Sequence, residues 1–260
     1  MRKMNWKAGT VLQGVAMPKY FFDPAQRVGD RITIEGTTAH HLLHVLRMGI
    51  GDSATLCDGA ATDYAATIET VKKSQVTFAL GNPQPCITEP QVQIVLYQSL
   101  PKGDKLEIII QKCVELGVHK IVPVMTAHCV ARIKDTAKKS ARYQAIAESA
   151  AGQSMRGTVP RVCEAVTFED AVSQVGKGGL TLVAHEQEQN NMLTAALSPA
   201  KIINIWIGPE GGFAQEEIAA LQNHGAITVS LGPRILRTET AAIAAVAVIS
   251  QFNRSENPTG

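Results

Sequence analysis

The chain has 260 residues, of which 45% are hydrophobic and 18% charged, and its formal net charge at pH 7 is +2. This composition excludes a disordered or fibrous protein, and the length allows two domains of ordinary size. The longest apolar run, AAIAAVAVI at 241–249, is too short to span a bilayer, so we expect no membrane association.

Residues 1–16 carry basic side chains but no continuous apolar core, which argues against a secretory signal. We interpret them as a flexible extension, which either belongs to the native protein or precedes its true start at Met17. Five cysteines form an odd number without a CxxC pair. This pattern favours reduced thiols in a cytoplasmic protein over a disulfide framework or a zinc site.

Residues 17–88 predict a small β-barrel with one helix. The segments YFFD, RITIE, ATLCDG, YAATIETV and QVTFAL are rich in β-branched and aromatic residues and are separated by turn residues. In TTAHHLLHVLRMG, a Thr is expected to cap the helix and Gly49 to end it in the left-handed conformation. The expected apolar face of this helix consists of Leu42, Leu43, Val45 and Leu46.

Residues 89–260 follow a proline-rich linker and alternate between strand and helix patterns. Strands are predicted at VQIVLYQ, KIVPVM, LTLVAH, NIWIG and ITVSLG, with helices at 104–116, 136–151, 214–224 and 239–252. Alternation predicts a mostly parallel sheet covered on both faces, which is an α/β domain. Within it, Lys and Arg outnumber Asp and Glu over residues 89–165. That excess fits either a surface for a polyanion such as RNA or an ordinary solvated face.

Three of the predicted strands end in unusual loops, LTLVAHEQE, NIWIGPEGGF and VSLGPRILRTE. Because ligands bind at the carboxyl ends of strands in such sheets, these loops are the predicted site. Gly208, Gly211 and Gly212 remove side chains where a ligand can approach the backbone, although a plain glycine-rich turn has the same pattern. Ile235 and Leu236 form either a pocket wall between two anion-binding arginines or a plug in the core.

Motifs that are absent narrow the chemistry. The sequence has no GxxxxGK[ST], no GxGxxG after a strand and no GxSxG, so it lacks the usual signatures for nucleoside triphosphates, dinucleotides and serine hydrolases. His40, His41 and His44 lack an acidic or Cys partner at ligand spacing. We therefore expect no metal site.

With LGPRILRTETA, IGPEGG, KGDKLEIIIQKCVELGVHKIVPV and HHLLHVLRMGIGD all present, the chain from about Met17 to Phe252 resembles the RsmE family. Members of that family are bacterial enzymes that use S-adenosylmethionine to methylate N3 of a uridine in 16S ribosomal RNA of the small subunit. The resemblance implies a PUA-like, RNA-binding barrel over 17–88. It also implies a SPOUT methyltransferase domain over 89–260, which contains a deep trefoil knot and forms homodimers.

The resemblance also implies roles for particular residues. The cofactor pocket is expected to be lined by Ala184, His185, Gly208, Pro209, Glu210, Gly211, Gly212, Leu231, Gly232, Ile235, Leu236 and Arg237. Arg237 is the candidate cation for the negative charge that develops on the uracil, because a guanidinium stays charged. Either Glu210 or Glu239 accepts the proton or positions Arg237; a plain first-turn helix charge is the alternative for Glu239.

RNA phosphates are expected to contact Arg47, Lys102, Lys112, Arg132, Lys134, Arg156, Arg161 and Arg234. Two segments depart from the family pattern, Gly152–Ser154 and Ala127–His128, and we expect both to lie outside the cofactor loops and to affect RNA contacts. Two other functions stay open. One is an RNA-binding assembly factor that has lost methyl transfer, and the other is a phosphate-binding α/β enzyme that uses GPEGG as an anion site.

Overall fold

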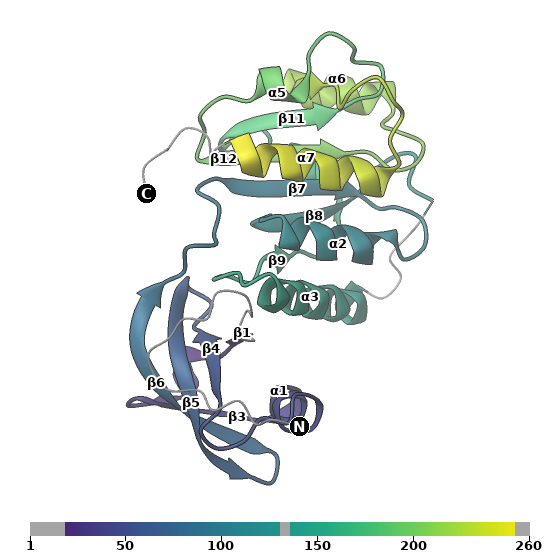
Figure 1. The fold of residues 1–260 in the computed structure, drawn as a ribbon. Helices are drawn as coiled ribbons and strands as arrows, with labels where there is room; N and C mark the ends of the chain where they lie inside the picture. The colour runs from purple at the N-terminus through teal and green to yellow at the C-terminus, as the bar shows by residue number, and fades with distance from the viewer. Residues whose placement is uncertain (1–18, 131–135, 253–260) are drawn as a thin grey trace. The chain divides into compact units, whose positions relative to one another are not determined.

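A computed structural model describes residues 19–130 and 136–252 of the chain. The predicted extension at 1–16 lies outside them. The chain divides into two compact units, which we describe separately (Figure 1). One runs to Asp58 and includes Asp63–Gln84, and the other comprises Gly59–Thr62 and the chain from Pro85 onward. Among the described residues, every helix is too short or too polar to cross a membrane.

The first unit is built on a six-stranded sheet with the order β1-β4-β5-β6-β3-β2, in which β1 runs parallel to β4. Its core contains Ile32, Leu56 and Phe78, because alternate residues of the strands point to one buried face. The elements are β1 (Lys19–Phe21), η1 (Pro24–Gln26), β2 (Arg27–Val28), β3 (Arg31–Ile34), α1 (Gly36–His40), η2 (His41–Val45), β4 (Ser53–Cys57), β5 (Thr62–Lys72) and β6 (Gln75–Pro85).

The predicted helix of this unit exists, but its ends and its apolar face differ from the prediction. It begins at Gly36 after Glu35, without a side-chain cap, so the predicted Thr cap is wrong. Arg47, with φ of 56°, takes the left-handed conformation that was assigned to Gly49. The second half, η2, is a π-helix, whose wider turn shifts the side chains around the axis. Leu42 is buried, whereas Val45 and Leu46 are exposed.

The second unit is an α/β domain whose main sheet has the order β10-β8-β7-β12-β11-β13, with β9 paired to β8. The recorded strand pairs are parallel, as predicted. The strands are β7 (Gln93–Ser99), β8 (Lys120–Met125), β9 (Arg161–Val162), β10 (Val166–Thr167), β11 (Leu180–Ala184), β12 (Ile202–Ile207) and β13 (Ile227–Val229). The helices are α2 (Lys105–Glu115), α3 (Thr136–Gln153), α4 (Phe168–Val172), α5 (Leu193–Ala196), α6 (Gln215–Asn223) and α7 (Thr238–Phe252).

Helices cover this sheet on both faces, as the strand and helix alternation predicts. On one face α4 and α6 pack against Trp206 of β12, which stacks on Tyr97 of β7 with ring centroids 4.4 Å apart. On the other face α2 and α7 lie side by side along the sheet (Figure 1). The prediction for α2 is confirmed in detail: Leu106, Ile109, Ile110 and Cys113 are buried, and Gly117 with φ of 98° follows its end. The short elements β9, β10, α4 and α5 were not predicted.

Candidate active site

The three unusual loops begin at the same edge of the sheet. β12 lies between β7 and β11, and β13 lies beside β11, so the carboxyl ends of these parallel strands meet. Two positions in the loops require glycine, because the backbone there has a positive φ that other residues rarely adopt: 68° at Gly212 and 109° at Gly232. The backbone N–H of His185 donates to Val229 O at 3.1 Å, which joins the first loop to the strand before the third.

A buried hydrogen-bond relay fixes the GPEGG loop to the start of α7. The Thr238 hydroxyl, only 4% exposed, donates to Gly208 O at 2.7 Å. Gln98 Nε2, at the end of β7, donates to the same hydroxyl oxygen at 2.9 Å. Sequence reasoning missed both residues. The available signal was a Gln at a position where strand alternation predicts a buried side chain, since buried polar groups need partners.

Lys105 brings the two candidate carboxylates together. Its ammonium lies 2.8 Å from Glu210 Oε1 and 3.3 Å from Glu239 Oε2, while the backbone N–H of Lys102 donates to Glu210 at 3.2 Å. Burial by itself raises the pKa of Glu210, but the hydrogen bonds from Lys105 and the backbone outweigh it and hold that pKa below its usual value. Glu210 is therefore a stable carboxylate and a weak proton acceptor.

The third loop presents Arg234, Ile235 and Arg237 to solvent, whereas Leu236 is half-buried. Ile235 is 92% exposed and both Arg234 and Arg237 are exposed, which rules out the alternative in which Ile235 fills the core. Among the described residues, the Arg237 side chain makes no hydrogen bond or ion pair. Its backbone carbonyl accepts from Ala241 N at 2.8 Å, so Arg237 is anchored to the first turn of α7. Its guanidinium is left available for a ligand.

The departure at Ala127–His128 follows β8 and so lies outside the three loops, but it contacts the GPEGG loop, which the sequence did not indicate. His128 Nδ1 is 3.0 Å from Gly211 O and 3.2 Å from Gly212 O. Because both partners are carbonyl oxygens, Nδ1 carries a proton and is the donor in these contacts. The backbone N–H of Ala127 donates to Glu217 Oε1 at 2.8 Å, at the start of α6. Sequence spacing did not reveal that the end of β8 lies beside this loop.

A family model described as "RNA methyltransferase domain" matches residues 88–250, and another described as "RNA methyltransferase PUA domain" matches residues 34–80. Ribosomal RNA small subunit methyltransferase E from Bacillus subtilis is 33% identical over 246 residues, which cover 90% of this chain and 96% of that protein. The chain belongs to the ribosomal RNA small subunit methyltransferase E family.

Solved structures of similar proteins match most of the chain. Ribosomal RNA small subunit methyltransferase E from Neisseria gonorrhoeae, bound to S-adenosyl methionine, has a TM-score of 0.83 and 32% identity; the match covers 90% of this chain and 97% of that one. A protein from Legionella pneumophila in complex with the bound cofactor SAM also has a TM-score of 0.83, with 33% identity and coverage of 91% and 98%. The predicted fold class, with a parallel-sheet α/β domain and a PUA-like domain before it, is confirmed. The knot stays a prediction.

The basic residues that were expected to contact RNA differ in exposure and in ion pairing. Arg132 and Lys134 lie outside the described residues. Lys112 forms an ion pair with Glu115 on the surface of α2. The remaining exposed candidates are Arg47, Lys102, Arg161 and Arg234.

Arg156 is buried and belongs to the internal structure, which corrects its assignment as an RNA contact. Its side chain is 3% exposed and donates to both carboxylate oxygens of Glu89, at 3.2 and 2.7 Å. The same guanidinium donates to the carbonyls of Val114 and Val118 at the end of α2. With these donors used inside the fold, Arg156 has no exposed face for a phosphate.

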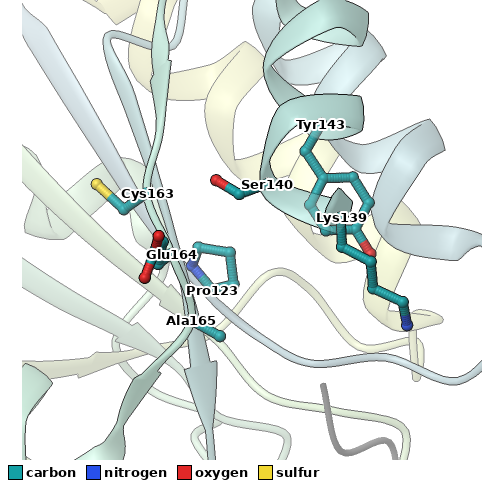
Figure 2. A pocket seen from close by; sticks show the side chains of 7 residues that line it. All are labelled: Pro123, Lys139, Ser140, Tyr143, Cys163, Glu164 and Ala165. Carbon is teal, nitrogen blue, oxygen red and sulfur yellow. The ribbon is translucent and has the colours of Figure 1, made fainter. Parts of the chain in front are cut away.

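A small pocket lies between α3 and the β8 side of the sheet (Figure 2), and its lining contains no residue of the three loops. Its volume is about 10 Å³, which is room for about one water molecule. It is lined by Pro123, Lys139, Ser140, Tyr143, Cys163, Glu164 and Ala165. It contains none of the predicted cofactor residues and is too small for a cofactor.

Within the described ranges, no group of three or more His, Cys, Asp and Glu side chains is placed to hold a metal ion. The rings of His40 and His44 lie 4.5 Å apart on one turn of helix. Two neighbouring imidazoles supply fewer ligands than the three or four that protein zinc sites use.

Proposed function

We propose that this chain transfers the methyl group of S-adenosylmethionine to N3 of a uridine in 16S ribosomal RNA of the small subunit, in the cytoplasm. The observation that carries this function is the meeting of three irregular loops at one sheet edge, with an unpaired Arg237 beside them. Family membership supports the same reaction. The domain bounds that we propose are 17–88 for the RNA-binding part and 89–260 for the methyltransferase part.

The residues at this edge fit S-adenosylmethionine. A side chain at Gly208, Gly211 or Gly212 would meet protein atoms, so the loop can keep this conformation only with glycines there. Gly211 is exposed and the other two are partly exposed, which leaves backbone within reach of a ligand, and the nearly fully exposed Ile235 offers an apolar surface to an adenine ring. The remaining pocket residues in this proposal are Ala184, His185, Pro209, Glu210, Leu231, Gly232, Leu236 and Arg237. The cofactor supplies a methyl group on a sulfonium.

The residues of the chain position the uridine and assist the removal of its N3 proton. N3 must lose a proton to become a nucleophile, and Arg237 stabilises the negative charge that spreads over the uracil. Glu210 is held by the Lys105 ammonium and the Lys102 N–H, with a lowered pKa. Glu239 shares the Lys105 ammonium and is the other candidate to accept the proton or to position Arg237. Positioning of the two reactants contributes the larger share of rate enhancement.

The direct test is transfer of labelled methyl from S-adenosylmethionine to small ribosomal subunits that lack the modification. Digestion and mass spectrometry of the nucleosides should show 3-methyluridine at one site. Cofactor binding without transfer to any RNA of the small subunit would contradict the proposal. Absence of cofactor binding would favour an assembly factor that binds RNA.

Replacing His128 with Ala should weaken binding of S-adenosylmethionine about fivefold. The substitution removes the donor shared by Gly211 O and Gly212 O, and an exposed hydrogen bond contributes about 1 kcal/mol. Isothermal titration calorimetry measures the change. His224→Ala is the matched control, because His224 Nδ1 contacts a carbonyl oxygen at the far end of α6. Equal affinities for both variants would show that His128 does not support the loop.

RNA binding should weaken steeply with salt. Arg47, Lys102, Arg161 and Arg234 offer about four phosphate contacts, for which the slope of log affinity against log salt is about −2.8 on single-stranded RNA. Arg161→Ala should reduce the magnitude of that slope by about 0.7. Filter binding from low to moderate salt measures it, with Lys177→Ala, at an exposed turn after α4, as the control. A flat salt response would exclude this electrostatic surface.

We also propose a homodimer whose seam includes α7. Ala241, Ala244 and Val248 leave a partly exposed apolar face on this helix, and the neighbouring helix α2 carries the exposed Ile108. Small side chains allow two helices to approach closely. Ala244→Glu should convert the dimer to a monomer in sedimentation at micromolar concentration. Ala219→Glu, on the exposed face of α6, should leave the dimer intact; a monomeric wild type would refute the seam.

A further inference from the structure

Three segments that are distant in the sequence converge on one ammonium group. Lys105 lies in the first turn of α2, Glu210 in the loop after β12, and Glu239 in the first turn of α7. The Lys105 side chain is 29% exposed, so water screens the cluster only in part. The hydrogen bond to Glu210 is the main cause that raises the pKa of Lys105, and the amine stays protonated.

The two carboxylates need this cation to stay together. Both bind the same ammonium, so without it two negative charges would face each other in a partly buried site. Two carboxylates that approach the same point repel each other when no cation lies between them. The segments that carry them would then move apart. The segments here are the GPEGG loop and the first turn of α7.

Movement of that turn would displace Arg237. Arg237 lies two residues before Glu239, and its carbonyl is hydrogen-bonded to Ala241 N within the same turn. The Gln98, Thr238 and Gly208 relay joins the same two segments on the buried side. The GPEGG loop and the first turn of α7 are therefore held together twice, by the relay on the buried side and by Lys105 on the exposed side.

We propose that Lys105 is a positioning residue for methyl transfer: by bridging Glu210 and Glu239 it holds the cofactor loop and Arg237 in a fixed relation. This inference rests on the proposed function. An isolated surface ion pair contributes little when it is removed, whereas a cation that holds two functional segments should affect both cofactor affinity and turnover.

The test compares Lys105→Met, Lys105→Arg and the double variant Lys105→Met with Glu239→Gln. Lys105→Met should bind S-adenosylmethionine at least tenfold more weakly, and its kcat at saturating cofactor and RNA should fall at least tenfold. Lys105→Arg keeps the charge and should recover most of both. The double variant removes the repulsion and should bind the cofactor within about threefold of wild type.

The matched control is Arg142→Met, which removes another cation paired with α2, through Glu107 at 2.8 Å. Its melting temperature should match that of Lys105→Met, and its cofactor affinity should match the wild type. The positioning role is overturned if Lys105→Met equals the wild type in affinity for S-adenosylmethionine or, where the wild type transfers methyl groups, in kcat. It is also overturned if Lys105→Met loses affinity and kcat together with a lower melting temperature, and if neither Lys105→Arg nor the double variant restores cofactor binding.

Failure of the proposed function has a different signature. In that case the wild type itself transfers no methyl group to the small subunit, whatever the Lys105 variants do. Affinity for S-adenosylmethionine is measured without RNA, so the effect of Lys105 on the cofactor loop is read independently. An unchanged affinity in Lys105→Met under those conditions refutes the inference.

Discussion

Arg237→Ala is expected to lower kcat for methyl transfer by about 10²- to 10³-fold, the cost of removing one preorganised group that stabilises a developing anion. The Arg237 side chain has no partner among the described residues, so its loss leaves no internal group unpaired and the fold should stay intact. Single-turnover transfer to small subunits measures the rate, and calorimetry measures cofactor affinity separately.

Two variants separate charge from geometry at this position. Arg237→Lys keeps a positive charge but loses the planar, forked donor arrangement, so it should restore only part of the rate. Arg234→Ala, three residues earlier in the same exposed loop, should raise KM for RNA while leaving kcat near the wild-type value. An Arg237→Ala enzyme with normal kcat would remove Arg237 from the mechanism.

The sequence predicted the structure well where buried apolar residues recur at a regular spacing. Apolar residues repeating at helical spacing located α2, and its buried side chains are those that the pattern predicts. Strand and helix alternation predicted a parallel sheet, and the parallel geometry placed three loops at one edge. The likeness to the RsmE family, carried by GPEGG and LGPRILRTETA, supplied the PUA-like domain and the cofactor, which no periodicity contains.

The errors arose where the decisive contact joins segments far apart in the chain. Arg156 stands in a basic region, and only the fold reveals that Glu89 lies against it. The departure at His128 was expected to bear on RNA contacts alone, because its neighbour in space, the GPEGG loop, is more than 80 residues away in sequence. The same limit hid Lys105 between Glu210 and Glu239. At Val45 and Leu46 the cause is local, because a π-turn breaks the assumed helical period.

Arg156→Met should destabilise the second unit by about 3 kcal/mol, because it leaves the Glu89 carboxylate enclosed without its cation. That carboxylate accepts two hydrogen bonds from Arg156, and its Oε1 also accepts from Gly157 N at 2.7 Å and Thr158 N at 3.1 Å. Urea unfolding measures the loss. Glu107→Gln breaks the exposed pair with Arg142 and should cost under about 1 kcal/mol.

Acid should reveal the same interaction in the wild type. Burial alone raises the pKa of Glu89, but the guanidinium and the donated hydrogen bonds outweigh it, so the net pKa lies below the ordinary value. The unfolded chain then binds this proton more readily than the folded one. The stabilisation is complete above the unfolded pKa and disappears as the pH falls through the folded pKa. Glu89→Gln should lack this acid-dependent component, and an identical pH profile for both proteins would show that the pair does not stabilise the fold.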